Sequence, residues 1–509
     1  MSNLASSIKS IQDVMRQDSG VDGDAQRISQ LTWLLFLKVF DALEEELELT
    51  RDSYTSPIPE PLRWRNWAAD AEGITGDTLL NFVNNDLFGA LKTLSGDAQR
   101  NPRGYVVRGV FEDAYNYMKS GHLLRQVINK INAIDFNRQS ERHQFNDLYE
   151  KILKDLQSAG NAGEFYTPRA VTQFMVDMVN PRLGEKMLDP ATGTGGFLVC
   201  AIEHLRQQVQ NTEQEALLQN SITGVEKKQL PHMLCVTNLM LHGIESMVES
   251  GDTLAPDGER IGKADLILTN PPFGTKKGGG RPTRSDFSIT ADTSNKQLAF
   301  VEHIVRALEP EGRAAVVLPD NVLFEDGVGR RLRTWMMELC DVHTILRLPT
   351  GIFYAQGVKT NVVFFTRGRN DKANTKGVWV YDMRANMDAF GKTKPLTVAD
   401  FKEFEKAFGD DPLGKAKRKD QGEEGRFRFY ERKDIASRND NLDITWLSDI
   451  SNDPEDEMTE PDEEDAEEEE EREGEEGPVD LEEAETAPPE ECEAVKNDTI
   501  DWEEIRLLS

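Results

Sequence analysis

Near Gly163 the sequence changes to short apolar runs that alternate with stretches of helical spacing, and this alternation sets the fold class. The helical stretches include Gly196–Gln210 and Leu298–Leu308. The pattern predicts an α/β fold in which a mostly parallel sheet is covered by helices on both faces. We expect Asn361–Phe365 and Val378–Tyr381, joined by a turn containing Gly and Asn, to add antiparallel strands at one edge. The candidate parallel strands are Met187–Leu188, Ile222–Val225, Leu266–Thr269, Ala314–Leu318 and Thr344–Leu348.

Residues 1–155 show a different pattern, in which apolar residues recur at helical spacing. This part of the chain is therefore predicted to be an α-helical domain that precedes the sheet. Residues 156–395 would form the sheet domain and residues 396–452 a mixed extension. The helical markers are Ile28, Leu31, Leu35, Val39 and Leu43, then Leu123, Val127, Ile128 and Ile131, then Leu148, Ile152 and Leu156.

Residues 453–493 contain 24 acidic residues and one basic residue, Arg472, so they carry −23 of the total charge of −32. Such a segment cannot bury enough apolar surface to offset chain entropy, and we expect a disordered acidic tract followed by a tail at 494–509. The tract could mimic DNA, repel off-target duplex or keep the chain soluble, and we favour the last role. The remaining charge of −9 neither indicates nor excludes a nucleic-acid binder.

The cysteines and the apolar runs indicate a cytoplasmic protein with no membrane partner. Cys200, Cys235, Cys340 and Cys492 stand far apart without a CxxC pair, which argues against a disulfide scaffold and a zinc knuckle. The most apolar run, Leu31–Phe40, is about half the length needed to span a bilayer. The seven histidines are scattered, and we expect no metal.

A glycine turn follows the first candidate strand and indicates a cofactor site. Glycines at such a turn let the backbone bend and let a ligand approach closely. An ordinary strand–helix turn is the alternative. Asp189, which precedes the glycines, would repel a pyrophosphate and attract an ammonium group, so the turn favours S-adenosylmethionine over a dinucleotide. The expected contacts are Asp189, Thr192, Gly193, Thr194, Gly195 and Gly196.

Two further acids are expected at the same edge of the sheet. Glu226 ends the next candidate strand, where a carboxylate can accept both ribose hydroxyls. Asp252 is expected to accept from the adenine amino group of the cofactor. Either acid alone could be a solvated loop carboxylate.

The tetrapeptide Asn270-Pro271-Pro272-Phe273 follows a buried candidate strand and indicates the chemistry, with a purely structural turn as the alternative. Two prolines fix the backbone and remove two N–H donors, which leaves carbonyl acceptors. The Asn270 side-chain oxygen and the Pro271 carbonyl can accept both hydrogens of a planar amino group, and Phe273 can stack on its ring. Both hydrogen bonds would direct the nitrogen lone pair toward an electrophile.

Asp189–Phe197 with Asn270–Phe273 resembles motifs one and four of S-adenosylmethionine-dependent methyltransferases that act on adenine N6 in DNA. Phe300 resembles the residue that packs against the cofactor adenine, and Phe353, in Arg347–Phe353, resembles an aromatic residue of the target-base pocket. Residues 161–169 resemble the N-terminal motif of the gamma group, which closes over the methionine end of the cofactor. That resemblance implies cofactor contacts by Glu164, Phe165, Tyr166, Thr167, Pro168 and Arg169.

Residues 1 to about 450 resemble the modification subunit of type I restriction–modification systems. The resemblance implies site-specific N6-adenine methylation of double-stranded DNA by base flipping. It also implies a specificity subunit bound by two copies of this chain, a motor-nuclease restriction subunit, and docking through the helical domain. After the tetrapeptide, Lys276, Lys277, Arg281 and Arg284 are expected to contact phosphates, with a solvated loop as the alternative. The alternatives are a methyltransferase acting on a protein glutamine amide or RNA, and a non-catalytic assembly subunit.

Overall fold

The computed structural model describes residues 2–95, 101–134, 149, 166–244, 248–274, 280–353, 358–387, 390–391 and 394–447. They belong to one compact unit, Met1–Ser451. The predicted acidic tract and tail lie outside the described residues, as does the predicted helix around Leu148–Leu156 apart from Tyr149. No helix in the described ranges is long and apolar enough to cross a membrane.

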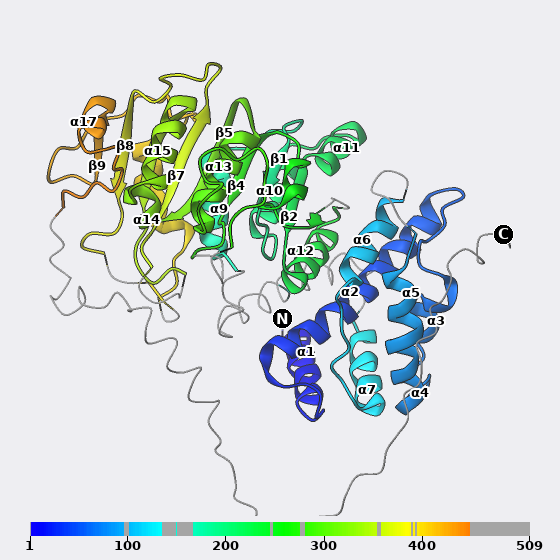
Figure 1. Ribbon diagram of the computed structural model, residues 1–509. Coiled ribbons are helices and arrows are strands. Elements are labelled where there is room, and N and C mark those ends of the chain that lie inside the picture. Colours follow the sequence, from blue (N-terminus) through cyan, green and yellow to red (C-terminus); the bar gives the residue numbers. More distant parts are fainter. Residues whose placement is uncertain are drawn as a thin grey trace, which may run out of the picture. The chain divides into compact units, whose positions relative to one another are not determined.

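The first part of the chain is helical, as predicted (Figure 1). Its core contains large aromatic side chains, among them Trp33, Phe36 and Phe111. Arg125 is buried and donates to the carbonyl oxygens of Trp67, Ala68, Asp70 and Ile74, which fastens the preceding loop to α7. The helices are α1 (Ser2–Met15), α2 (Gly23–Thr50), α3 (Trp64–Trp67), α4 (Gly76–Asn81), α5 (Phe88–Lys92), α6 (Pro102–Phe111) and α7 (Gly121–Asn132).

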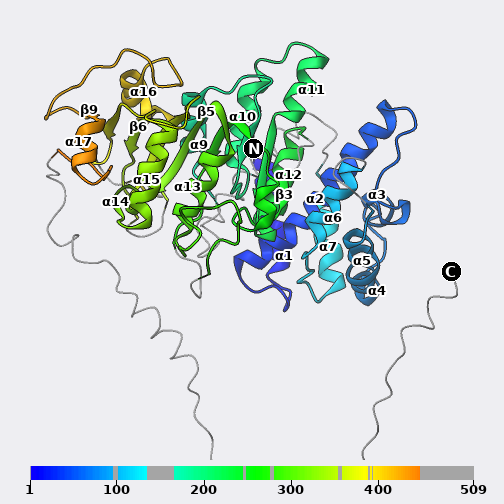
Figure 2. The same cartoon turned by 45° about the horizontal axis from the view of Figure 1, so that its top comes forward.

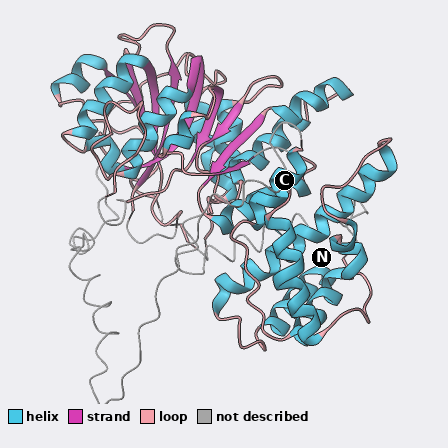
Figure 3. Cartoon of the chain, turned by 45° about the vertical axis from the view of Figure 1, so that its right-hand side comes forward, coloured by secondary structure: helices cyan, strands magenta, loops and turns pink. Residues whose placement is uncertain are grey.

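The second part is built on a nine-stranded sheet of order β3-β2-β1-β4-β5-β7-β6-β8-β9. The strands β3, β2, β1, β4 and β5 pair in parallel. This confirms the predicted α/β class, and Figure 3 shows the strands as one sheet beside helices. The strands are β1 (Met187–Asp189), β2 (Ile222–Glu226), β3 (Val248–Ser250), β4 (Ala264–Thr269), β5 (Leu308–Pro319), β6 (Cys340–Arg347), β7 (Thr360–Arg367), β8 (Gly377–Asp382) and β9 (Phe427–Glu431).

The expected antiparallel addition of two strands at the edge is wrong in its detail. β7 is antiparallel, but it lies between β5 and β6 in the interior of the sheet. β8 pairs in parallel with β6, and the antiparallel edge strand is β9. Seven of the eight β7 residues are buried, as the continuous apolar run Val362–Phe365 requires of a central strand, whereas β9 is mostly exposed or half-buried.

Helices pack against both faces of the sheet because neighbouring residues of each strand point to opposite sides. In β4, Leu266 and Leu268 join a core with α9 (Arg169–Val179) and α10 (Gly196–Arg206), whereas Ile267 joins a core with α13 (Lys296–Ala307) and α15 (Val328–Leu339). Figure 2 shows α13 and α15 side by side. The remaining helices are α11 (Thr212–Asn220), α12 (Gln229–Leu241), α14 (Asp320–Phe324), α16 (Lys402–Phe408) and α17 (Arg432–Ser437).

The parallel register brings the predicted site residues to one edge. Asp189 aligns with Gly224 and Glu226 aligns with Ser250, while Asn270 directly follows the last residue of β4. Ligands of open parallel sheets bind at this edge, outside the carboxyl ends of the strands. Between β1 and β2 the chain forms two separate helices, α10 and α11, which accounts for the long distance in sequence between the glycine turn and Glu226.

Candidate active site

The glycine turn has a backbone that requires glycine at two positions. Gly193 and Gly195 have φ angles of 53° and 82°. A Cβ atom on Gly195 would also lie 2.7 Å from the Sγ atom of Cys235. The amide of Thr192 donates to the Val225 carbonyl at 3.1 Å, which ties the turn to β2 before α10 begins. The turn is therefore packed closely against Cys235 and tied to β2.

Asp189 is fully buried at the start of this turn. Its Oδ1 atom accepts from the amide of Ala191 at 3.1 Å, but its Oδ2 atom has no hydrogen-bond partner among the described residues. Burial raises the pKa of Asp189 to about 7, and the adjacent Thr269 hydroxyl and Ala191 amide oppose that rise. A buried carboxyl with an unused oxygen can accept a hydrogen bond from a cationic ligand.

Glu226 holds the glycine turn directly. Its Oε2 atom accepts from the Gly193 amide at 2.9 Å, and its Oε1 atom accepts from the Lys228 amide at 2.8 Å. Burial raises its pKa despite these two bonds. A carboxylate has about four acceptor positions, so two amides leave capacity for ligand hydroxyls.

Asp252 and Phe300 lie in the segments that flank this turn. Asp252 accepts from the Leu254 amide at 2.9 Å and pairs with the Lys227 ammonium at 2.8 Å. The Thr253 hydroxyl donates to the Pro190 carbonyl at 2.6 Å, which joins the Asp252 loop to the glycine turn. Phe300 is buried in a small apolar cluster with Leu254, Phe287 and Ala299, and Ala191 of the turn packs against it.

Asn270 presents an unused acceptor at the end of β4. Its Nδ2 atom donates to the Thr167 hydroxyl at 3.1 Å, while its Oδ1 atom is buried and lacks a partner in the described part of the chain. Pro271 is buried and Phe273 is half-buried against the core. The amide side chain is thus oriented by its donor group and keeps its acceptor free for a ligand.

The N-terminal motif meets both the tetrapeptide and the glycine turn. Thr167 bonds Asn270, and the Arg169 guanidinium donates to the Gly196 carbonyl at 3.0 Å. Tyr166, Thr167, Pro168 and Arg169 are half-buried just before and at the start of α9. Glu164 and Phe165 lie outside the described residues.

The four basic residues expected to contact phosphates are not alike. Lys276 and Lys277 lie outside the described residues. Arg281 is exposed, and its guanidinium lies 3.2 Å from an oxygen of Asp292. The phosphate contact expected of Arg284 is corrected by the structure, because the Arg284 side chain is only 4% exposed and its guanidinium is paired with Asp286. The remaining residue expected near DNA, Phe353, is half-buried beyond the end of β6.

The residues present fit S-adenosylmethionine. A close-packed glycine turn lies beside the unpartnered oxygen of Asp189, and the Phe300 cluster offers an apolar wall for an adenine ring. Among the residues that the structure describes, no group of three or more His, Cys, Asp or Glu side chains could hold a metal ion. Thr269, whose hydroxyl opposes the raised pKa of Asp189, was missed from the sequence, although its place directly before Asn270 was a signal.

This chain is similar in sequence to known proteins over most of its length. A family model described as N-6 DNA Methylase matches residues 140–456, and one described as HsdM N-terminal domain matches residues 4–131. The chain is 50% identical to the type I restriction enzyme EcoEI methylase subunit of Escherichia coli, over 89% of this chain and 93% of that protein. It is 34% identical to the EcoKI methylase subunit of E. coli K12, over 83% of this chain and 84% of that one.

Solved structures show the same similarity. A structure described under complex assembly and conformational transition of the type I R-M system is 30% identical, with a TM-score of 0.74, and covers 92% of this chain and 95% of that chain. The crystal structure of the EcoKI M protein is 32% identical, with a TM-score of 0.53, and covers 89% of this chain and 90% of that chain.

Proposed function

Because this chain belongs to the methylase subunits of type I restriction enzymes and to the N-6 DNA methylase family, we propose that it transfers a methyl group from S-adenosylmethionine to adenine N6 in duplex DNA. The observation that carries this proposal is the buried, unpartnered Oδ1 atom of Asn270 at the carboxyl end of β4. An acceptor left unused in a buried position costs stability unless a ligand satisfies it. An exocyclic amino group is a suitable donor.

The tetrapeptide would activate the amino group through hydrogen bonds. Thr167 fixes the Asn270 amide so that Oδ1 accepts one hydrogen, and the Pro271 carbonyl accepts the other. With both hydrogens held, the nitrogen lone pair leaves conjugation with the ring. Positioning then supplies most of the rate, and no general base of matched pKa is needed before attack.

The target adenine must leave the duplex to reach Asn270. Flipping a base costs a few kcal/mol of stacking and pairing, which contacts in the pocket must offset. The half-buried rings of Phe273 and Phe353 are the aromatic surfaces that we assign to this role. Lys276, Lys277 and Arg281 are the residues we assign to the phosphates, and Arg284 is left out because it is buried.

The carboxyl edge of β1, β2 and β3 would hold the cofactor. Asp189 would accept from its ammonium group, Glu226 from its ribose hydroxyls and Asp252 from its adenine amino group, beside Phe300. The motif from Glu164 to Arg169 would cover its methionine end. S-adenosylmethionine, when bound, supplies a methyl group on a positively charged sulfur.

Membership of this family supports a proposal for the partners. A related structure is described under complex assembly of the type I R-M system, and it covers nearly the whole of this chain. We propose that two copies of this chain bind one specificity subunit, which selects the DNA sequence, and that a motor-nuclease restriction subunit completes the complex. The helical domain is proposed as the docking surface.

The test is incubation of the chain and its specificity subunit with labelled S-adenosylmethionine and unmethylated DNA. We expect label in DNA, at adenine N6. Label found only in protein or in RNA would instead establish one of the alternative methyltransferase activities. No transfer to any acceptor, with cofactor binding intact, would indicate a non-catalytic assembly subunit.

A further inference from the structure

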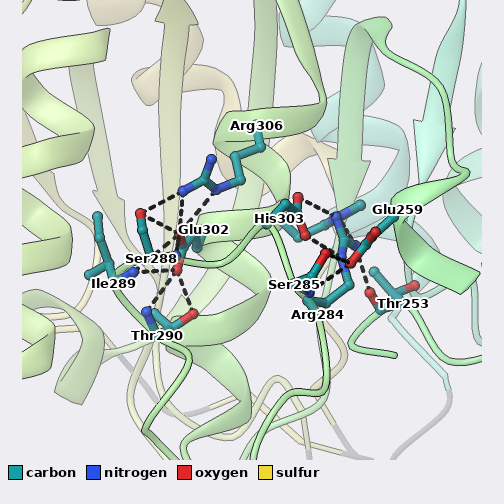
Figure 4. Close-up of polar contacts among 11 residues, drawn as sticks. Thr253, Glu259, Arg284, Ser285, Ser288, Ile289, Thr290, Glu302, His303 and Arg306 are labelled. Atoms are coloured by element: carbon teal, nitrogen blue, oxygen red, sulfur yellow. Dashed lines mark hydrogen bonds and ion pairs between the residues drawn. The ribbon is translucent and has the colours of Figure 1, made fainter. Parts of the chain in front are cut away.

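A buried arginine lies ten residues after Asn270-Pro271-Pro272-Phe273-Gly274, at the end of the segment expected to grip phosphates. The Arg284 Nε and Nη2 atoms donate to the two carboxylate oxygens of Asp286, each at 2.8 Å. Its Nη1 atom donates to the Thr253 carbonyl at 2.9 Å (Figure 4). A guanidinium held by a bidentate carboxylate and a buried carbonyl has its donors engaged inside the protein.

The partners of Arg284 belong to the cofactor side of the site. Thr253 directly follows Asp252, and its hydroxyl bonds the Pro190 carbonyl of the glycine turn. The Arg284 guanidinium carbon also lies 4.8 Å from the ring centroid of Phe287, which packs with Leu254 and Phe300. One side chain therefore supports both the backbone beside Asp252 and the apolar cluster.

The neighbouring backbone is shaped to admit this guanidinium. A Cβ atom on Gly258 would lie 2.0 Å from the Thr253 carbonyl oxygen and 2.5 Å from the Arg284 Nη1 atom. A side chain at residue 258 would therefore displace the very contact that Arg284 makes. The next residue, Ser285, donates from its amide and its hydroxyl to Glu259. These bonds are a second link between the segment 253–259 and the segment that begins at Arg284.

Helix α13 fixes Arg284 from the other side. The His303 Nδ1 atom lies 3.1 Å from Arg284 Nη1. Burial, with a further contribution from Arg284, lowers the pKa of His303 to about 3, so the ring is neutral and its nitrogen can accept. Glu302, the preceding residue, accepts from the amides of Ser288 and Thr290 (Figure 4). The segment 284–290 is thus clamped to α13 at both ends.

We propose that Arg284 is a positioning residue for the adenine end of the cofactor site and acts through the Thr253 carbonyl and the Phe287 ring. It holds the Asp252 loop and the apolar cluster at the separation that an adenine ring needs. This inference rests on the proposed function, because it assumes that S-adenosylmethionine binds at this edge. It replaces the phosphate contact expected of Arg284 from the sequence.

The experiment measures the Kd of S-adenosylmethionine by calorimetry, without DNA, for the wild type, Arg284→Gln, Arg284→Lys and Arg313→Gln. Arg313 is the matched control, because it is also buried and bidentate, with Glu185, and also bonds a backbone carbonyl, that of Val179. We expect Arg284→Gln to raise Kd about tenfold, since a buried charge-assisted hydrogen bond is lost. The Kd of Arg284→Lys should lie between those of the wild type and Arg284→Gln. The Kd of Arg313→Gln should equal that of the wild type, although its Tm should fall.

Other outcomes overturn the inference. An unchanged Kd for Arg284→Gln, with a lowered Tm like that of Arg313→Gln, would make Arg284 purely structural. If Arg284→Gln leaves this Kd unchanged but makes DNA binding less dependent on salt in a separate titration, the phosphate contact expected from the sequence would be supported instead. If Arg284→Gln does not fold, Phe287→Leu takes its place and must raise Kd. A wild type that binds no S-adenosylmethionine would refute the proposed function itself.

Discussion

Two buried acids, Asp189 at the end of β1 and Glu302 on α13, differ in how fully they are bonded. Glu302 is fully buried, and both of its oxygens accept hydrogen bonds from Thr290, Ser288 and Arg306 among others. Burial raises its pKa, but these bonds outweigh burial and the net pKa is lowered. Asp189 is equally buried, keeps one oxygen unpartnered, and has a raised pKa. In this pair, the acid whose two oxygens are both bonded, Glu302, ties a loop to α13, whereas the acid with an unpartnered oxygen, Asp189, lies at the candidate site.

The sharpest test of the buried polar atoms that lack a hydrogen-bond partner is the substitution Asn270→Ala. Loss of the free acceptor should lower kcat for methyl transfer about 10³-fold, as removal of one transition-state hydrogen bond does elsewhere. The Kd of S-adenosylmethionine should stay within about twofold, because the proposed partner of Asn270 is the acceptor amino group and not the cofactor. Both are measured with labelled cofactor, by transfer and by filter binding. Unchanged kcat would remove Asn270 from the mechanism.

For the fully hydrogen-bonded carboxylate, the substitution Glu302→Gln should lower the stability of the protein. The amide of glutamine would face N–H donors, so about 3 kcal/mol of unfolding free energy should be lost, measured in denaturant. Because the folded pKa of Glu302 is lowered, its contribution is present above the ordinary value of 4.5 and is lost as the pH falls through the lower folded pKa, so the wild-type and variant curves should converge in acid. The control Glu311→Gln, an exposed partner of Arg369, should cost less than about 1 kcal/mol.

Cofactor affinity should depend on pH through Asp189. A carboxylate pairs with an ammonium group only when it is ionised, and burial raises the pKa of Asp189 to about 7. Affinity should therefore fall by about tenfold for each pH unit below 7, and it should also fall above about pH 8, where the α-amino group of the cofactor loses its proton. Calorimetry across this range checks the slope, and Asp189→Asn should bind weakly at every pH. A flat profile for the wild type would contradict the role of Asp189.

The sequence predicted that the candidate site residues lie at one edge of the sheet because they end strands, and strand ends meet at one edge in a parallel sheet. Apolar runs that can be recognised in the sequence alone lead to Asp189, Glu226 and Asn270. The place of β7 and the burial of Arg284 were not predictable in this way. Both depend on partners distant in the chain: β7 enters between β5 and β6, and Arg284 is enclosed by Thr253 and His303.

A matched pair of threonines gives the smallest and finest test of the comparison. Thr269 and Thr290 are both fully buried, but the Thr290 hydroxyl bonds Glu302 at 2.7 Å, whereas the Thr269 hydroxyl has no partner of normal geometry in the described ranges. Thr290→Val should cost about 1–2 kcal/mol of stability and leave the pH profile of cofactor binding unchanged. Thr269→Val should cost less, since the interaction of its hydroxyl with the Asp189 carboxylate falls short of normal hydrogen-bond geometry.

The second readout separates the two threonines by function. The Thr269 hydroxyl lowers the pKa of Asp189 against the effect of burial, so its removal should raise that pKa further. The midpoint of the pH dependence of cofactor binding should then move upward in Thr269→Val and stay in place in Thr290→Val. Equal profiles for both variants, with equal losses of stability, would mean that unmet hydrogen-bonding capacity does not distinguish the site from its scaffold.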